Sequence, residues 1–229
     1  MKTLTVSTTK QEQYLGWFYL VFQMLILPDL ILLIAALMGF ELTGTIMNVI
    51  YFTINFLSTV IIFRRFLWRS AKRSWKEPLR LIKSVGVGFV LYWFFNFLVV
   101  NLAMFVSPQY QNVNDATIGA MAQGAFTAIA ICTILLAPVY EELLFRGLMF
   151  QGLFHRSKLL AYGVSSAVFS LIHLVSYIGL ISPINFLVGF VQYLPAGIAL
   201  GYAYEKADSI YAPIIMHMFI NAIGMFAMR

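Results

Sequence analysis

The chain has 229 residues, of which 61% are apolar and only 10% are charged. A soluble domain carries about 25% charged and roughly 45–50% apolar residues, so a soluble globular fold is excluded. Aromatic residues at 16% and a single cysteine also exclude a disordered chain and a disulfide scaffold. The composition therefore predicts an all-α, polytopic transmembrane helix bundle.

Seven apolar runs are long enough to be spanning helices, and we expect about seven spans in one integral membrane domain, residues 1–229. Their approximate bounds are 14–39, 43–63, 84–106, 119–139, 160–178, 184–204 and 211–228. The first run is too long for a signal peptide and lacks a small-residue cleavage site, so we interpret it as a retained span. A further apolar segment, 140–154, follows the fourth run without a clear break and could form an eighth helix or a re-entrant segment.

The cations of the chain, which give it a net charge of +6, fall almost entirely on one side of this predicted bundle. One side holds Lys2, Lys10, Arg64, Arg65, Arg69, Lys72, Arg73, Lys76, Arg80, Lys83, Arg146, Arg156, Lys158 and Lys206, and the other holds only Arg229. The positive-inside rule then predicts a cytoplasmic N-terminus.

Residues 64–84 contain eight cations, a single acid and several aromatic side chains. We expect the basic segment 64–83 to lie in the headgroup region, with tryptophans at the interface and cations on anionic lipid. This charge favours a lipid partner over nucleic acid. Two interpretations stay open, a generic topology anchor and a surface that recruits substrate.

The sequence APVYEELLFRG at 137–147 places three charged residues in or beside an apolar run. On a helix, Glu142 and Arg146 are i,i+4 neighbours in the favourable order for an ion pair. Glu141 points about 100° away from Glu142, so it is left without that partner. A carboxylate held at the membrane boundary is a candidate general base, although a doubly charged helix end tied by one ion pair is the structural alternative.

Two further patterns lie in later apolar runs, FSLIH at 169–173 and HMFIN at 217–221. Phe169 and His173 share one helix face, as do His217 and Asn221, since each pair is four residues apart. Glu141, His173, His217 and Asn221 thus come from three helices and could together bind and activate a water molecule. The two histidines could hold a divalent metal such as Zn²⁺, or they could donate hydrogen bonds to an oxyanion without any metal.

Several other polar or titratable residues do not belong to this predicted water site. Asp29 follows a proline within the first run, where its carboxylate could sit in a kink facing the bundle or contact a partner. Asn185 and Gln192 are seven residues apart and could line a cavity. His155 lies in a basic loop and is expected at the surface, and Cys132 has no polar neighbour in sequence.

The three motifs in this order resemble the CPBP intramembrane proteases, which include CAAX prenyl proteases and bacteriocin-processing enzymes and are also called the Abi family. That family combines EExxxR, FxxxH and HxxxN on successive membrane helices. The resemblance covers about 137–221, within an expected catalytic core at 119–228. It implies a helical membrane endopeptidase with a cavity open to the cytoplasmic side. The short chain resembles bacterial members of the family, which implies a bacterial plasma membrane.

By motif position, the resemblance makes Glu141 the catalytic base and places His173, His217 and Asn221 around the water. Glu142, Arg146 and Phe169 would support them. The substrate would be a membrane-associated peptide or protein, and a (metallo)protease and a metal-free mechanism both stay open. Two other hypotheses remain. One is a non-catalytic scaffold or bacteriocin self-immunity protein. The other is a transporter that relays protons, but the sequence shows no evident inverted repeat of the kind that many transporters contain.

Overall fold

The computed structural model describes residues 4–227, and this part of the chain is helical, with no strand. The α-helices are α1 (Lys10–Leu25), α2 (Leu27–Leu37), α3 (Gly44–Ile62), α4 (Arg64–Lys76), α5 (Pro78–Val106), α6 (Val113–Ala130), α7 (Ala137–Glu142), α8 (Gln151–Phe154), α9 (Lys158–Ile172), α10 (Pro183–Ala207) and α11 (Tyr211–Ala227). Two π-helical segments, η1 (Ile131–Leu136) and η2 (Leu143–Phe150), flank α7, and a 3₁₀ turn, η3 (Val175–Tyr177), follows α9. The predicted all-α class is confirmed.

Four helical stretches are long and apolar enough to cross a membrane: α3, α5, the continuous stretch 113–154 and α10. Helices α1 and α2 bend by 57° at their junction and make a fifth if they count as one span. Helices α9 and α11 are shorter, with 15 and 17 residues. Helix length and composition thus indicate an integral membrane protein with four or five candidate spans, fewer than the seven expected.

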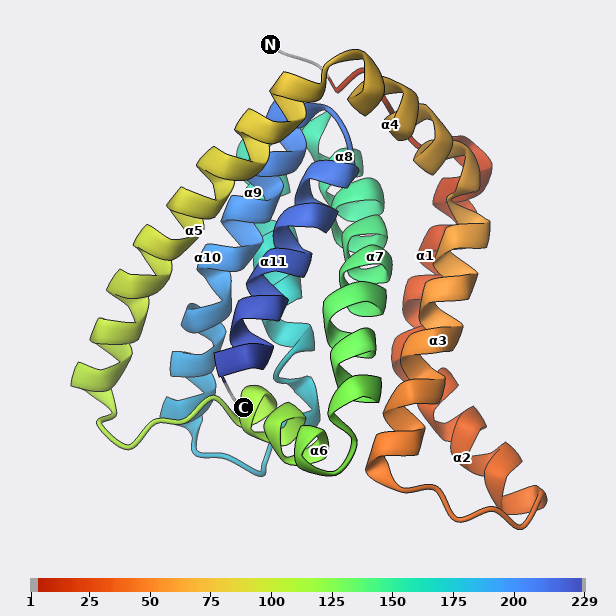
Figure 1. Ribbon diagram of the computed structural model, residues 1–229, viewed down its shortest axis with the longest axis vertical. Coiled ribbons are helices and arrows are strands. Elements are labelled where there is room, and N and C mark those ends of the chain that lie inside the picture. Colours follow the sequence, from red (N-terminus) through yellow and green to blue (C-terminus); the bar gives the residue numbers. More distant parts are fainter. Residues whose placement is uncertain (1–3, 228–229) are drawn as a thin grey trace.

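Residues 140–154 form neither a separate helix nor a re-entrant segment, because the helix that begins after Ala125 continues without a break through α8. The one sharp change of direction lies earlier, at Ala125, whose φ of −152° and ψ of 50° are not helical. In Figure 1, α6 lies across the lower end of the molecule, and the chain then rises through α7 to α8. The predicted motif at 137–147 therefore lies in the middle of a long rising helix.

Helix α4 crosses the upper end of the molecule between α3 and α5 (Figure 1). It buries Phe66 and Ser70 against the core and leaves Trp68 and Trp75 exposed, as an interfacial helix should. The predicted basic segment is divided, however, because Pro78 opens α5 and a proline favours the first turn of a helix. We call this end of the molecule, with the loops 155–157 and 208–210, the basic end.

The charges at the junction of α4 and α5 are tied to one another. Glu77 accepts hydrogen bonds from Arg73 at 2.6 Å and from Arg80 at 3.1 Å. The Arg80 guanidinium, assisted by the charge of Arg73, holds the pKa of Glu77 below its usual value. Some cations of the basic end are thus paired within the protein.

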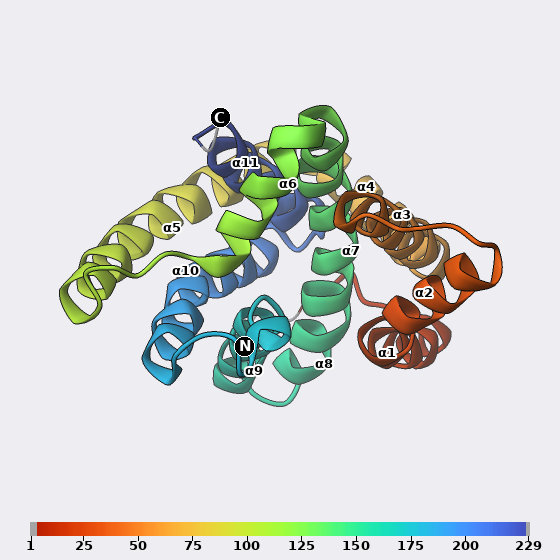
Figure 2. The same cartoon turned by 90° about the horizontal axis from the view of Figure 1, so that it is seen from below.

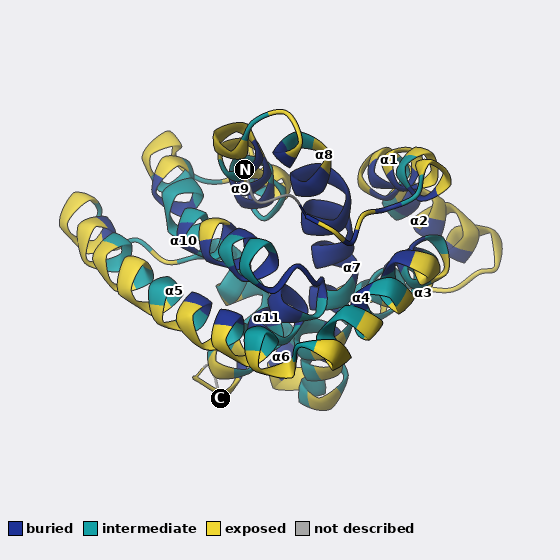
Figure 3. Ribbon diagram, turned by 90° about the horizontal axis from the view of Figure 1, so that it is seen from above, coloured by how far each residue is buried: buried dark blue, intermediate teal, exposed yellow. Residues whose placement is uncertain are grey.

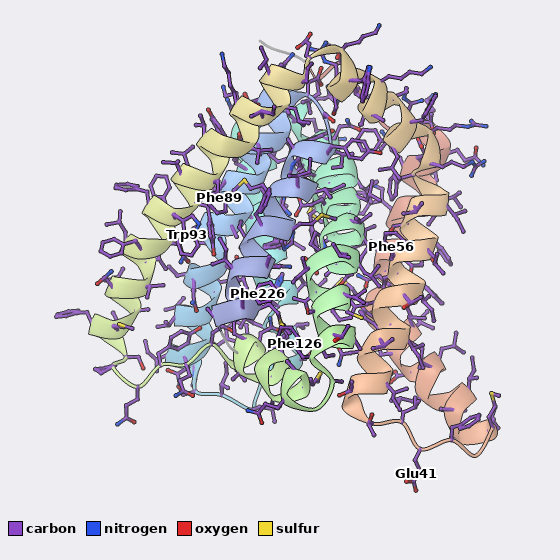
Figure 4. All side chains as sticks on the ribbon, in the orientation of Figure 1. Glu41, Phe56, Phe89, Trp93, Phe126 and Phe226 are labelled. Atoms are coloured by element: carbon purple, nitrogen blue, oxygen red, sulfur yellow. The ribbon has the colours of Figure 1, made fainter. Side chains whose placement is uncertain are left out.

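The packed core lies toward the basic end, where η2, α8, α10 and α11 meet. Seen from above in Figure 3, buried residues fill the centre of the molecule, and exposed residues line the outer faces of α2 and α5. Aromatic side chains such as Phe89 and Trp93 cover α5 in Figure 4. Extensive exposed apolar surface is expected where helices face lipid.

The N-terminal residues before α1 cross the basic end and are fastened to it. Leu4 and Val6 are buried, and the backbone N–H of Thr5 donates to Asp208 Oδ1 at 2.8 Å. Gln151 donates to the Val6 carbonyl at 2.8 Å, and its Oε1 accepts from the Thr8 N–H at the same distance. We call residues 4–9 the N-terminal strap.

Candidate active site

A cavity of about 510 Å³ lies between the helices, and all four residues expected to hold the water line it: Glu141, His173, His217 and Asn221. They come from α7, the C-terminal end of α9, and α11. Viewed from below in Figure 2, α6, α7, α9, α10 and α11 surround the centre of the molecule. The structure therefore brings the three sequence motifs to one place.

Glu141 has a free oxygen directed at both histidines. Its side chain is only 11% exposed, and Oε2 has no hydrogen-bond partner within residues 4–227. This oxygen lies 4.0 Å from His173 Nε2 and 3.9 Å from His217 Nε2. A buried polar atom without a partner in the described part of the chain calls for a water or ligand, and Glu141 Oε2 is such an atom, with the two histidine nitrogens facing it across one gap.

The other ring nitrogen of each histidine is engaged. His173 Nδ1 donates to the Phe169 carbonyl at 2.7 Å, four residues back on α9. His217 Nδ1 donates to Glu142 Oε1 at 2.8 Å. Since a carbonyl and a carboxylate only accept, these bonds fix the proton on Nδ1 and turn Nε2 of both rings toward Glu141.

The ion pair expected from the i,i+4 spacing is present and buried. Arg146 Nη1 lies 2.9 Å from Glu142 Oε1, and both side chains are 0% exposed. Arg146 Nη2 also donates to the Gly197 carbonyl of α10, and its guanidinium lies 4.6 Å from the centre of the Phe169 ring. Glu142 therefore links the arginine to His217, so the pair orients a histidine of the site.

Phe169 is a packing centre for the site. It is 2% exposed, and its ring lies 4.6 Å from the His173 ring and 5.8 Å from the His217 ring. Its opposite neighbour is Phe145, in an edge-on contact at 5.5 Å. The FxxxH spacing thus gives one aromatic side chain that supports both histidines.

Asn221 is held by an irregularity in the helix before the glutamates. In η1 the Ala137 N–H bonds the Cys132 carbonyl, five residues back. The next bond of that pattern would run from residue 138 to Thr133, but Pro138 has no N–H. The Thr133 carbonyl instead accepts from Asn221 Nδ2 at 2.8 Å. π-Helical turns often mark functional sites, and this one supplies the partner that fixes the carboxamide.

Sequence analysis missed one residue of the site, Tyr193 on α10. Its ring stacks on His173 with centroids 4.4 Å apart and planes at 25°. Its hydroxyl accepts from Asn114 Nδ2 at 3.1 Å and donates to Asn112 Oδ1 at 3.2 Å. The polar cluster at 112–115 and the aromatic residue beside Gln192 were signals, but nothing in sequence joins them to His173.

Among the other predicted residues, Gln192 lines the cavity and accepts hydrogen bonds from Tyr110 and Asn112. Asn185 does not line it and accepts from Ser107 Oγ instead. His155 is exposed, as expected, and Cys132 is buried and free.

The expectation for Asp29 that placed its carboxylate in a kink facing the bundle is wrong. Asp29 is exposed in the first turn of α2, where a carboxylate suits the helix N-terminus. Only the preceding Pro28 lines the cavity.

The donor set does not have the spacing of a metal site. Tetrahedral zinc with bonds of about 2.0–2.1 Å holds its ligand atoms roughly 3.3 Å apart, whereas the Nε2 atoms lie 3.9 and 4.0 Å from Glu141 Oε2. No group of three or more His, Cys, Asp or Glu residues in the described part of the chain has metal-binding geometry. We therefore derive no chemical step through a metal from these residues.

The cavity opens away from the basic end. Its most exposed lining residues are Met24, Val175 and Ser176, and none comes from 53–91, 142–168 or 197–216. The cation distribution predicts that the basic end is cytoplasmic, and the family resemblance implies a cavity open to the cytoplasmic side. These two expectations conflict, because the cavity opens at the opposite end. We call the end with the loops 38–43, 107–112 and 174–182 the open end.

Residues 122–223 match the family model for type II CAAX prenyl endopeptidase Rce1-like proteins, and this part of the chain is a domain of that family. The match contains all three motifs and confirms the resemblance deduced from them. No curated protein and no solved structure matches the chain.

Proposed function

We propose that the protein is an intramembrane endopeptidase that hydrolyses a peptide bond in a membrane-associated peptide or protein. The observation that carries this proposal is the Glu141 oxygen without a hydrogen-bond partner, 3.9–4.0 Å from two histidine nitrogens inside a cavity. A water in this gap would contact a base and two ring nitrogens able to accept a hydrogen bond from it. The family of residues 122–223 supports the same class of reaction.

In the proposed reaction Glu141 takes a proton from the water as its oxygen attacks the peptide carbonyl carbon. The carbonyl oxygen becomes an oxyanion, and the second hydrogen of Asn221 Nδ2, free of the bond to Thr133, can donate to it. Glu141 then passes its proton to the amide nitrogen as the C–N bond breaks. The products are a carboxylic acid and an amine, and transfer of the acid's proton to the amine gives a carboxylate and an ammonium group.

The supporting roles follow from contacts. Glu142 accepts hydrogen bonds from His217 Nδ1 and from the Arg146 guanidinium, so it fixes the ring and its own charge is balanced. Phe169 fixes His173 through its carbonyl and its ring. We assign Glu142, Arg146 and Phe169 as positioning residues and Glu141, His173, His217 and Asn221 as the water site.

We also propose seven spans with a cytoplasmic N-terminus. The bent pair α1–α2, then α3, α5, the rising helix that ends with α8, and α9, α10 and α11 give seven crossings. At about 1.5 Å per residue, α9 and α11 are roughly 22 and 26 Å long, near the lower limit for a span. Exposed Trp68 and Trp75 on α4 support an anionic lipid contact.

The test is cleavage of a mixture of synthetic membrane peptides by purified protein in liposomes, with products identified by mass spectrometry. A general base accelerates a reaction by a factor of about 10²–10⁴, so we expect Glu141→Gln to lower the cleavage rate at least about 100-fold. Asp29→Asn, an exposed carboxylate on α2, is the matched control and keeps wild-type cleavage.

Wild-type turnover by folded Glu141→Gln protein would reject the proposed base. Absence of cleavage by every variant, with unchanged phenotype in cells, would favour the non-catalytic scaffold. A parallel assay with a chelator tests whether cleavage depends on a metal. If the chelator abolishes cleavage by the wild-type protein and added Zn²⁺ restores it, His173 and His217 would be assigned as metal ligands.

A further inference from the structure

The two ends of the molecule differ in charge. The loops at the open end carry no Lys or Arg in 38–43, 107–112 or 174–182, and Glu41 projects from that end in Figure 4. The basic end carries α4, Arg156, Lys158 and Lys206. These loops are short, the condition under which cations orient a membrane protein, so the basic end is the cytoplasmic one.

The cytoplasmic end is also closed. Leu4 and Val6 of the N-terminal strap are buried there. Beneath the strap, Phe66, Phe150 and Ile210 are each 0% exposed in one packed cluster. Glu141 lies 13 residues before Phe154 in the rising helix, which is roughly 20 Å along the helix axis from that end.

Along the cavity wall, burial decreases toward the open end. Glu141 and His217 are buried, Asn221 and Tyr193 are partly buried, and Ser176 is exposed. The wall holds two carboxylates, Glu141 and Asp115, and no Lys or Arg among its described residues. Such a wall disfavours an anionic segment, because no cation is available to neutralise it.

We propose that substrate reaches the site from the extracytoplasmic side, as an extended segment that is uncharged or cationic. The substrate class is then a transmembrane or exported peptide whose scissile bond enters from the outer half of the membrane. This inference rests on the proposed function for the chemistry at Glu141. The direction of access rests only on charge and packing.

The experiment is cysteine labelling in spheroplasts of a bacterial host that expresses the full chain. Cys132 is first replaced by alanine, which leaves a background without other thiols. Single cysteines are then placed at Ser176 on the cavity rim, at Leu180 on the same loop and at Trp75 on α4. Leu180 and Trp75 are 76% and 89% exposed, so both can react from their own side.

A membrane-impermeant maleimide should label Ser176→Cys and Leu180→Cys in intact spheroplasts at least tenfold more than Trp75→Cys. After lysis all three should react. Labelling of Trp75→Cys alone before lysis would overturn the orientation. Labelling of Leu180→Cys without Ser176→Cys, before and after lysis, would overturn access through this rim.

A second arm connects access to chemistry. Asn48 lines the cavity on α3, apart from the proposed catalytic residues. Treatment of Asn48→Cys spheroplasts with a bulky impermeant maleimide should abolish cleavage of an added peptide, while labelled Leu180→Cys protein keeps it. Unchanged cleavage by labelled Asn48→Cys protein would contradict the proposed route. Labelling by itself needs no activity, so failure of the proposed function and failure of the access proposal give different results.

Discussion

At the residue scale, Tyr193 extends the site beyond the three motifs. Its ring stacks on His173, and its hydroxyl is held by Asn112 and Asn114 of the open end. An aromatic pair is worth about 0.5–1.5 kcal/mol beyond burial, or about 2–12-fold in rate if the histidine loses its orientation. The residues near the cavity opening are thereby linked to the catalytic centre.

We expect Tyr193→Leu to lower kcat about tenfold, because stacking and hydroxyl contacts are both lost. Tyr193→Phe keeps the ring and should lower kcat by less than about threefold. The measurement is kcat and KM with the peptide identified above, together with the pH–rate profile, which a change at His173 should shift. Tyr202→Leu, on the same helix but outside the cavity, is the control; equal effects at both positions would assign Tyr193 a merely structural role.

At the element scale, α9 and α10 approach so closely that only glycine fits at 197. A Cβ there would lie 2.7 Å from Ser166 Cβ and 2.8 Å from its Cα, which is backbone and cannot move aside. The Gly197 carbonyl also accepts from Arg146, so displacement of α10 would loosen the buried ion pair. Helix packing and the site are therefore coupled at this contact.

Gly197→Ala should lower the free energy of unfolding by about 1–3 kcal/mol, the usual cost of overpacking. Gly163→Ala on α9 is the matched control, since no atom lies within 4 Å of its Cβ position. That change should be neutral or raise stability by up to about 1 kcal/mol through helix propensity. Thermal unfolding in detergent measures both; equal melting temperatures would show that the helices can separate without cost.

The local part of the site was predictable from sequence, and the non-local part was not. The i,i+4 spacing of Glu142 and Arg146 fixes their pairing within one helix, and the structure confirms it. The bond from Asn221 to Thr133 spans 88 residues, and no periodicity reports it. Likewise the kink at Ala125 follows Gly124, but a single glycine in an apolar run does not by itself predict a kink, so the predicted span of 119–139 missed both the kink and the continuous helix to Phe154.

At the scale of the whole molecule, the basic end contributes most of the packing that stabilises the fold, and the open end gives access to the cavity. The largest packed cluster and the N-terminal strap lie at the basic end, and the cavity reaches the surface at the other. A protein that must keep an aqueous cavity within apolar surroundings gains little packing there. Loosening the basic end should therefore reduce stability without changing how reagents enter the cavity.

Substitution of Asp208 can test whether stability depends on the basic end while access to the cavity does not. It adopts φ 54° and ψ 37°, accepts from the Thr5 backbone N–H and hydroxyl, and lies 3.5 Å from Arg73 Nε. Glycine tolerates this left-handed conformation, so Asp208→Gly removes the acceptors without adding backbone strain. Hydrogen bonds to a charged group are worth about 1.5–3 kcal/mol each, so loss of the two bonds from Thr5 should lower the free energy of unfolding by about 3–6 kcal/mol.

Limited proteolysis should cut the N-terminal strap of Asp208→Gly faster than that of the wild type, while Ser176→Cys labelling proceeds at an unchanged rate. Asp208→Asn keeps one side-chain acceptor and also tolerates positive φ, so it should lower the free energy of unfolding by less than Asp208→Gly does. Glu41→Gly, in the exposed loop of the open end, should change neither stability nor proteolysis of the strap. Faster labelling at Ser176→Cys in Asp208→Gly would contradict the separation, because it would mean that the strap also governs the opening of the cavity.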